Sequence, residues 1–174
     1  MPLTIPSGYP GSSGYRMGIR ETEIAIKMIK DHFEREIADT LNLTRVSAPL
    51  FVRPETGLND NLNGIERPVG FDILETGDVV EIVQSLAKWK RMALKEYGFT
   101  CHEGIYTDMN AIRRDEITDN LHSLYVDQWD WEMVISPEDR NLDFLVKTVS
   151  KIYSCFFRTQ SNILRFYPFL DRKL

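Results

Sequence analysis

The stretch LYVDQWDWEMVI, Leu124 to Ile135, has the alternating pattern of a β-strand but an unusual composition. Alternate side chains of an extended chain share a face. Strands favour β-branched and aromatic residues and are poor in Asp. Here two tryptophans stand among acids and an amide, namely Asp127, Gln128, Asp130 and Glu132. Neither face is cleanly polar or apolar, so we interpret the stretch as a strand that runs from the core into a pocket.

A partner strand precedes this stretch. Gly104 to Arg113 alternates in the same way, and a polar loop separates the two, which predicts an antiparallel pair. Directly opposite residues of such a pair face the same side. The register therefore decides whether Arg113 shares a face with Gln128 and Asp130. It does so if the numbers of two opposite residues add up to an odd sum, as when Arg113 lies opposite His122. A bulge that shifts the register between them would have the same effect. We expect all three side chains to line one pocket.

The chain before this hairpin is expected to contain a helix, a strand and a loop. Apolar residues at spacings of three and four predict an amphipathic helix from Glu21 to about Asn42. The alternation over residues 46–52 predicts a strand, and Pro49 within it lacks a backbone donor, which indicates an edge or interface strand. Residues 53–68 are rich in turn formers and should form a loop.

Two more helices and a short strand are expected around the hairpin. Residues 79–83 read as a strand, and residues 84–98 as a helix that Gly98 ends. Ser136 and Pro137 are typical of the start of another helix. The apolar face predicted for the helix at 84–98 consists of Leu86, Trp89, Ala93 and Tyr97.

Composition restricts the class of protein. With 174 residues and 43% hydrophobic residues, the chain can bury a real core. A net charge of −5 disfavours tight nucleic-acid binding. The sequence has neither an apolar run long enough to span a membrane nor the apolar core of a signal peptide, so we expect no membrane partner. Cys101 and Cys155 form no metal or disulfide pattern, which fits the cytoplasm.

The sequence divides into three segments. Residues 1–18 are rich in Pro, Gly and Ser and predict an irregular lead-in. Residues 19–150 carry the periodic patterns. Residues 151–174 hold five basic residues, one acid and many aromatics with little clean period, and they resemble a truncated or frameshifted end.

Three further groups of residues could carry chemistry, and each has a plain alternative. Asp60 lies in a polar loop that an Asx-turn would also explain. Ser85 and Lys90, at the start of a helix, suit an anionic ligand, but a solvated helix face explains them too. Arg113 could clamp a phosphate, or it and Glu116 could belong to a charged hairpin tip. The three histidines have no paired spacing, so we assign no metal ligand.

Taken in order along the chain, these motifs resemble one family, the ammonia-dependent asparagine synthetases or aspartate–ammonia ligases. The resemblance covers about Arg20 to Lys151. The stretches that carry it are SAPLF (47–51), GLNDNLNG (57–64), SLAKWKR (85–91), EGIYTDMNAIRRDE (103–116) and LHSLYVDQWDWE (121–132). The family is similar to the catalytic core of class II aminoacyl-tRNA synthetases. The resemblance therefore implies an α+β fold, with an antiparallel sheet flanked by helices, that is incomplete in this chain.

The resemblance also implies a reaction. The side-chain carboxylate of L-aspartate attacks the α-phosphate of ATP, with Mg²⁺, to give β-aspartyl-adenylate and pyrophosphate. Ammonia then displaces AMP to give L-asparagine. The helix from Glu21 to Leu41 and the strand with Pro49 resemble the class's first motif, which implies a homodimer.

Individual roles follow from the matching positions. Arg113, Lys90 and Asp60 would be the catalytic residues, and Arg113 would bind the α-phosphate and the aspartyl carboxylate. The amino-acid pocket implied by the resemblance consists of Asp60, Ser85, Lys90, Arg113, Gln128 and Asp130. The ATP site implied by it consists of Arg113, Glu116, Leu121 and Ser123.

The chain departs from the family in two ways. Gln84 stands where members usually have His, and Gln cannot titrate near neutrality. The change is costly if that position handles the ammonium proton and neutral if it only packs, and the sequence leaves both open. Family chains are also about twice this long, and the missing part carries further acids and a clamping arginine. The chain is therefore either the N-terminal half of a ligase or a non-catalytic remnant that dimerises and binds aspartate or AMP. Aminoacylation of transfer RNA is disfavoured by the acidic charge.

Overall fold

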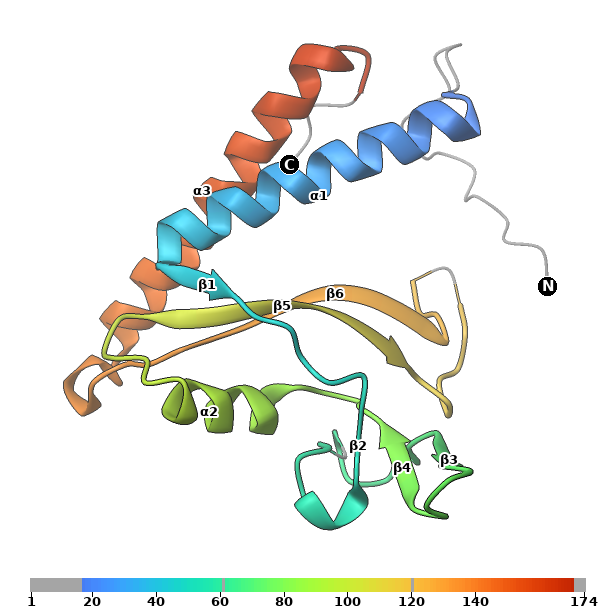
Figure 1. Ribbon diagram of the computed structural model, residues 1–174. Coiled ribbons are helices and arrows are strands. Elements are labelled where there is room, and N and C mark those ends of the chain that lie inside the picture. Colours follow the sequence, from blue (N-terminus) through green and yellow to red (C-terminus); the bar gives the residue numbers. More distant parts are fainter. Residues whose placement is uncertain (1–16, 61, 120, 171–174) are drawn as a thin grey trace. The chain divides into compact units, whose positions relative to one another are not determined.

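A computed structural model describes residues 17–60, 62–119 and 121–170. The chain forms two compact units, which are described separately (Figure 1). The sheet unit is Leu43–Val134, and the helix unit combines Met1–Asn42 with Ile135–Leu174. Most of the expected lead-in, residues 1–16, and the last four residues of the tail lie outside the described residues. The division into 1–18, 19–150 and 151–174 stays a prediction.

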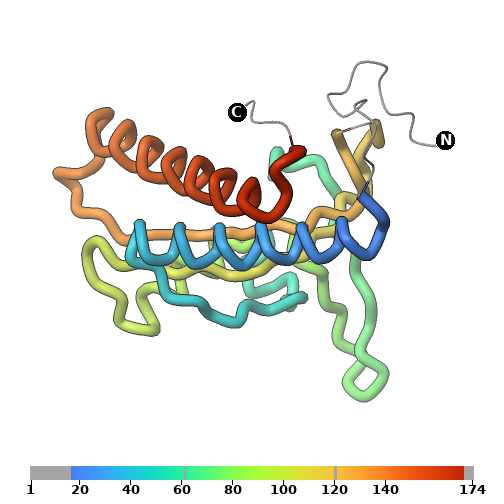
Figure 2. The backbone as a smooth tube through the Cα atoms, turned by 90° about the horizontal axis from the view of Figure 1, so that it is seen from above, coloured from blue at the N-terminus to red at the C-terminus, as the bar shows by residue number. Residues whose placement is uncertain are grey.

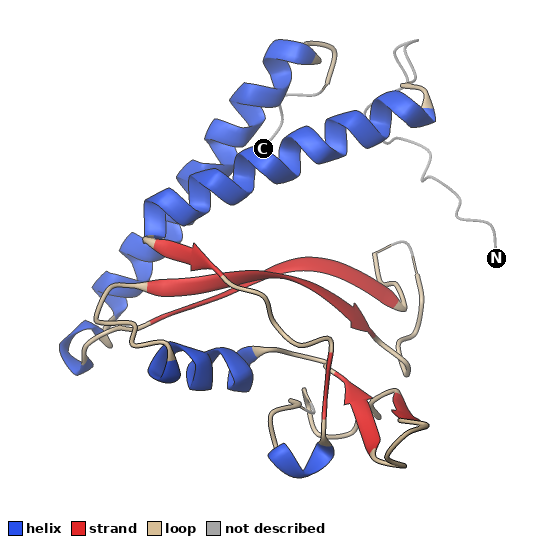
Figure 3. Cartoon of the chain, viewed as in Figure 1, coloured by secondary structure: helices blue, strands red, loops and turns tan. Residues whose placement is uncertain are grey.

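The sheet unit is built on the predicted hairpin. Strands β5 (Gly104–Ile112) and β6 (Tyr125–Met133) pair antiparallel over nine residues each. Strand β1 (Leu43–Arg45) adds to β5 in parallel, giving the order β1-β5-β6. Helix α2 (Ala87–Glu96) packs against β5 and β6 (Figure 3). The fold is thus α+β, with an antiparallel hairpin at its centre, as expected.

The core of this unit lies between α2 and one face of the hairpin. On β5 the odd-numbered residues Ile105, Thr107, Met109 and Ala111 are all buried, as alternation requires of a covered face. Gly104 must be small, because a Cβ there would lie 2.5 Å from the Glu132 carbonyl oxygen. The buried residues of α2 and its N-cap include Leu86, Trp89, Ala93 and Leu94. Tyr97, predicted on this face, is 55% exposed, because it is the C-cap residue where the helix ends.

A second, smaller sheet has the order β2-β4-β3, formed by Phe51–Val52, Val79–Ile82 and Gly70–Asp72. The predicted strand at 46–52 is wrong as a single strand. Residues 43–45 join the first sheet as β1, residues 51–52 join the second as β2, and Pro49 lies between them. Proline cannot donate to a ladder, so the chain changes sheets there. The predicted loop at 53–68 contains one short 3-10 turn, η1 (Pro54–Thr56).

The helix unit consists of two long helices. Helix α1 (Ile19–Leu41) ends at Asn42, which has the left-handed φ of 55° that suits a C-cap, as predicted within a residue. Ser136 and Pro137 begin only a 3-10 turn, η2 (Pro137–Asp139), closed by a capping box with Asp139. Helix α3 (Leu142–Phe166) begins after its own N-cap, Asn141. It continues through most of the segment at 151–174, where the sequence indicates an apolar helical face only as far as Phe156.

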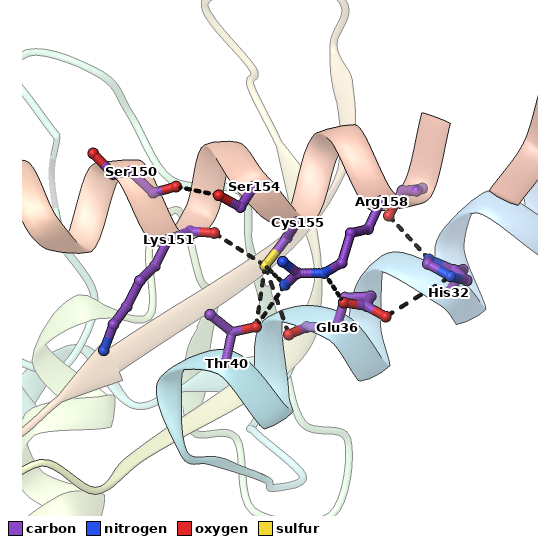
Figure 4. A network of polar contacts seen from close by, with 9 residues as sticks. His32, Glu36, Thr40, Ser150, Lys151, Ser154, Cys155 and Arg158 are labelled. Carbon is purple, nitrogen blue, oxygen red and sulfur yellow. Dashed lines mark hydrogen bonds and ion pairs between the residues drawn. The ribbon is translucent and has the colours of Figure 1, made fainter. Parts of the chain in front are cut away.

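Helices α1 and α3 lie side by side and antiparallel (Figure 2). His32 contacts Thr159 at 3.1 Å between Nδ1 and Oγ1, and further along α1 the Thr40 hydroxyl accepts a 2.9 Å bond from Arg158. Arg158 also pairs with Glu36, and the fully buried Cys155 lies within this network (Figure 4). Neither these helices nor any other described helix is long and apolar enough to cross a membrane.

Candidate functional site

A pocket of about 350 Å³ opens in the sheet unit where three segments meet. These are the loop before β3, the turn before α2, and the end of β5 with the residues that follow it. Its lining residues are Leu62, Glu66, Gln84, Arg113, Arg114, Asp115 and Glu116. The pocket therefore contains two of the predicted site residues, Arg113 and Glu116, and the position at which the sequence departs from its family's usual His.

The register of the hairpin places Arg113 on the predicted face. Its backbone N–H donates to the Leu124 carbonyl at 2.7 Å, which extends the β5–β6 ladder by one pair. Within the ladder each odd-numbered residue of β5 faces an even-numbered residue of β6, for example Met109 opposite Gln128. Arg113 therefore shares a face with Gln128 and Asp130, which confirms the prediction of an odd sum. The Nη1 atom of Arg113 is buried and has no hydrogen-bond partner.

Gln84 is the most buried residue of the pocket lining, at 1% exposure. Its backbone N–H donates to Oδ1 of Asn59 at 2.8 Å, which fixes the residue. The amide oxygen Oε1 is buried and has no hydrogen-bond partner. Unpaired buried acceptors are uncommon in folded proteins. Gln84 and Arg113, which each carry a buried polar atom without a hydrogen-bond partner, thus line one pocket.

Asn59 organises this side of the site, and sequence reasoning missed it. Besides accepting from Gln84, its Nδ2 donates to Oε2 of Glu81 at 3.1 Å and to the Ile82 carbonyl at 3.4 Å. At 7% exposure it fastens the loop that carries Asp60 to the end of β4. An amide beside Asp60 was visible in the sequence, but turn chemistry explained it, and nothing local revealed its long-range partners.

Lys90 explains the acids on strand β6. Its side chain is 1% exposed, and Nζ donates to Oδ1 of Asp130 at 2.5 Å and to the Trp131 carbonyl at 3.0 Å. Glu132 lies 3.7 Å from the same nitrogen. A buried ammonium must be paired, so the two acids on the α2 side of the hairpin neutralise it. The alternative of a solvated helix face is therefore wrong for Lys90, which instead joins α2 to β6.

An ion pair joins two parts of the pocket wall. The backbone N–H of Arg67 donates to Oδ2 of Asp115 at 2.9 Å, and its Nε donates to the same oxygen at 3.1 Å. These hydrogen bonds from Arg67 lower the pKa of Asp115 to about 2. Arg114 adds a 3.4 Å bond to the Pro68 carbonyl. Because Asp115 and Arg114 are engaged in this way, Glu116, Arg113 and Gln84 remain as the groups that face a ligand.

Comparison with known proteins decides the family. The profile described as aspartate-ammonia ligase matches residues 20–174. The chain belongs to this family. The match includes residues 151–174, which the motifs had left outside the resemblance.

Several curated relatives bear the name aspartate–ammonia ligase. The protein from Ruminiclostridium cellulolyticum is 63% identical over 173 residues, which is 99% of this chain and 50% of the relative. The protein from Fusobacterium nucleatum is 63% identical over 158 residues, which is 91% of this chain and 48% of the relative. The protein from Clostridium tetani is 57% identical over 173 residues, which is 99% of this chain and 50% of the relative. The chain spans about half the length of the curated relatives it matches.

A solved structure supports the fold expected of an aspartate–ammonia ligase. A Bacillus halodurans protein described as an ATP phosphoribosyltransferase regulatory subunit/histidyl-tRNA synthetase matches with a TM-score of 0.54 and 11% identity. The match covers 86% of this chain and 40% of that chain. The fold is thus class II aminoacyl-tRNA synthetase-like, and at this identity the likeness shows the fold alone.

The remaining residues that the ligase resemblance assigns to the amino-acid pocket are not among the residues that line this pocket, so of Arg113, Gln128 and Asp130 only Arg113 lines it. Asp60 follows Asn59 and is half-buried. The Ser85 hydroxyl accepts from the Ala87 N–H at 3.2 Å, at the first turn of α2. Gln128 donates from Nε2 to the Met109 sulfur at 3.2 Å. The roles of these residues, and those of Lys90 and Asp130, stay predictions.

Two predicted nucleotide contacts lie in the exposed loop between β5 and β6. Leu121 is 91% exposed and Ser123 is exposed, and neither lines the pocket. Asp119 shapes this loop, because its Oδ1 accepts from the backbone N–H groups of Leu121 and His122 at 2.7 Å. These bonds and the His122 side chain lower the pKa of Asp119 to about 2, and the same carboxylate raises the pKa of His122.

Proposed function

We propose that the chain is the N-terminal half of an ATP-dependent aspartate–ammonia ligase of asparagine biosynthesis. Such an enzyme converts L-aspartate, ammonia and ATP into L-asparagine, AMP and pyrophosphate through β-aspartyl-adenylate. One observation carries the proposal: the unpartnered nitrogen of Arg113 and the unpartnered oxygen of Gln84 line one pocket beside Glu116. Family membership supplies the reaction for which such a pocket is suited.

The nucleotide is assigned to the Arg113 side of the pocket. A planar guanidinium binds a phosphate or carboxylate through two parallel bonds, and a low-dielectric pocket strengthens those bonds. The free Nη1 of Arg113 therefore suits the α-phosphate as the aspartyl carboxylate attacks it. Glu116 is assigned to the adenine or its ribose. The loop held by Asp119 would bring Leu121 and Ser123 against the nucleotide, which requires the exposed Leu121 to become covered.

Aspartate is assigned to the segments next to the pocket. Asp60 would bind the amino acid, and Ser85 and Lys90 its carboxylates, with Gln128 and Asp130 completing the site. In the structure Lys90 is already neutralised by Asp130 at 2.5 Å, so aspartate would have to share or displace that contact. A rigid strand and a paired lysine are a suitable platform for a small ligand, because their geometry is set before the ligand arrives.

Mg²⁺ enters the proposal as part of Mg-ATP. Glu66 and Glu116 supply carboxylate oxygens in the pocket, and these fit a hard cation that is bound largely through phosphate oxygens and water. When bound, Mg²⁺ neutralises phosphate charge. This chain's residues then have to bind aspartate, orient it towards the α-phosphate and exclude water.

We include a cytoplasmic homodimer in the proposal. Helix α1 presents the apolar side chains of Ile19, Ile24 and Ile26, which are 86%, 49% and 45% exposed. Strand β6 pairs only with β5, so one sheet edge is also open within the described part of the sheet unit. Exposed apolar surface and open edges favour association. Sedimentation should show dimers or larger species, and a compact monomer at high concentration would contradict the homodimer.

The isolated chain should make little or no asparagine. The second half of the relatives would supply further transition-state contacts, and each such contact contributes about a hundredfold in rate. The test joins this chain to the second half of the R. cellulolyticum ligase, replacing the half to which it is 63% identical. We expect the completed chain, but not the isolated one, to form asparagine and AMP. An inactive completed chain beside an active relative would contradict the proposed function.

A further inference from the structure

The Gln84 side chain is buried without a use inside the protein. It is 1% exposed, it lines the pocket, and its Oε1 has no hydrogen-bond partner. A buried acceptor without a partner destabilises the folded chain, because it has lost its hydrogen bonds to water. A residue that only packs would therefore not need an amide at this position. The backbone of Gln84 is held by the bond from its N–H to Oδ1 of Asn59. The oxygen is therefore held in place for a group that is absent from the folded chain itself.

The chemistry of that group is restricted by what an amide oxygen can do. Oε1 only accepts, so the bound atom must be a donor. Phosphate and ionised carboxylate oxygens only accept, and in this pocket they suit the free Nη1 of Arg113 instead. The pocket thus offers a donor to an anion and an acceptor to an N–H group within one cavity.

Building on the proposed function, we infer that Gln84 binds the attacking ammonia. The reaction has three N–H donors: ammonia, the aspartate ammonium and the adenine amine. Adenine is assigned to Glu116, and a cationic ammonium is better held by the carboxylate of Asp60. A neutral amide favours protonated ammonium, which has no lone pair for attack, less than a carboxylate does. Gln84 also lines the same pocket as Arg113, where the adenylate is formed.

The step balances without a further reactant. The ammonia nitrogen forms a bond to the β-carbonyl carbon of the adenylate, and the bond from that carbon to the phosphate oxygen breaks. AMP leaves with the bonding pair, and one proton passes to water, which leaves the neutral amide of asparagine. Gln84 accepts one N–H of ammonia and aims the lone pair. It takes no proton, because an amide does not titrate near neutrality.

The test uses the completed chain described above. Gln84→Met keeps the size of the side chain and removes the oxygen, whereas Gln84→Glu keeps an acceptor. Gln160→Met, on α3, is the matched control. Two rates are measured: aspartate-dependent ATP–pyrophosphate exchange without ammonia, and asparagine formation against ammonium concentration. Melting curves verify that each variant is folded.

We expect Gln84→Met to raise the KM for ammonium by about tenfold, the loss of one hydrogen bond, with exchange changed by less than about twofold. Gln84→Glu keeps an acceptor but favours ammonium, so it should also slow asparagine formation, and Gln84→His should add a pH dependence near the imidazole pKa of about 6.5. If Gln84→Met slows the exchange as much as it slows asparagine formation, or leaves the KM for ammonium unchanged, this inference is wrong, whereas the proposed function is not affected. If the unsubstituted completed chain lacks exchange, the proposed function fails first.

Discussion

The sheet unit and the helix unit each hold a basic side chain against an acid of a neighbouring element, but they bury it differently. In the sheet unit the Lys90 side chain is 1% exposed and its partner Asp130 24%. In the helix unit the Arg158 side chain is 45% exposed and its partner Glu36 29%. The first pair joins helix α2 to strand β6, whereas the second joins helices α1 and α3. A charge that has been fully removed from water indicates a place where the fold has been built for more than stability.

The largest expected effect belongs to Arg113, whose buried nitrogen has no partner in the chain. Arg113→Ala in the completed chain should lower aspartate-dependent ATP–pyrophosphate exchange by about a hundredfold to a thousandfold, because one preorganised donor to the transition state is lost. The melting temperature should change little. Exchange within about threefold of the parent would mean that the pocket does not bind the reacting phosphate.

The comparison of the two ion pairs is tested by removing each cation. Lys90→Met leaves Asp130 and Glu132 facing a buried site, and we expect a loss of about 3 kcal/mol in the free energy of unfolding. Arg158→Met removes a half-exposed pair that salt screens, and the loss should be about 1 kcal/mol or less. Urea denaturation of the 174-residue chain measures both. Equal losses would remove the distinction drawn between the two units.

Gln128 should have a smaller effect than Arg113 although both lie on one face of the hairpin. Gln128→Ala should raise the KM for aspartate by about tenfold and leave the maximal exchange rate nearly unchanged, since one neutral hydrogen bond to the amino acid is lost. A fall in the maximal rate with an unchanged KM would instead assign Gln128 to the reacting atoms.

The smallest effect concerns the loop between β5 and β6. Because Asp119 raises the pKa of His122, their bond stabilises the loop fully below about pH 6.5 and is lost as pH rises through the raised pKa. Because the pKa of Asp119 is lowered to about 2, its contribution is present above about pH 4 and is lost towards pH 2. The protection of the Leu121 and His122 amides relative to their intrinsic exchange rates should therefore fall above neutral pH, and His122→Asn should abolish that fall.

Much of the sheet unit was predictable because local patterns and tertiary structure agree there. Alternation along 104–113 and 124–135 indicated the hairpin. The requirement that Arg113, Gln128 and Asp130 share a face predicted an odd sum for opposite residue numbers, and the hairpin has such a register. The C-terminal end of α1 was predictable from Asn42. The resemblance added roles, but it did not reveal that Lys90 is paired with Asp130 across two elements.

The errors arose where long-range contacts decide. Residues 46–52 alternate like one strand, yet only residues 51–52 form one, as β2, and the pairing with β5 ends before them at Arg45. The segment after residue 150 lacks a clean apolar period, because polar residues of α3 such as Arg158 and Thr159 face α1 and form polar contacts with it. Asn59 looked like a turn residue, and only the folded chain shows that it holds Gln84. No local pattern encodes such partners.

The most direct test of the account follows the oxygen atoms of the reaction. The completed chain is supplied with ATP, ammonia and aspartate labelled with ¹⁸O in its side-chain carboxylate, and the products are weighed by mass spectrometry. Attack of that carboxylate on the α-phosphate predicts one labelled oxygen in AMP and unlabelled pyrophosphate. Label in pyrophosphate or inorganic phosphate, or turnover that leaves AMP unlabelled, would contradict formation of β-aspartyl-adenylate at this pocket.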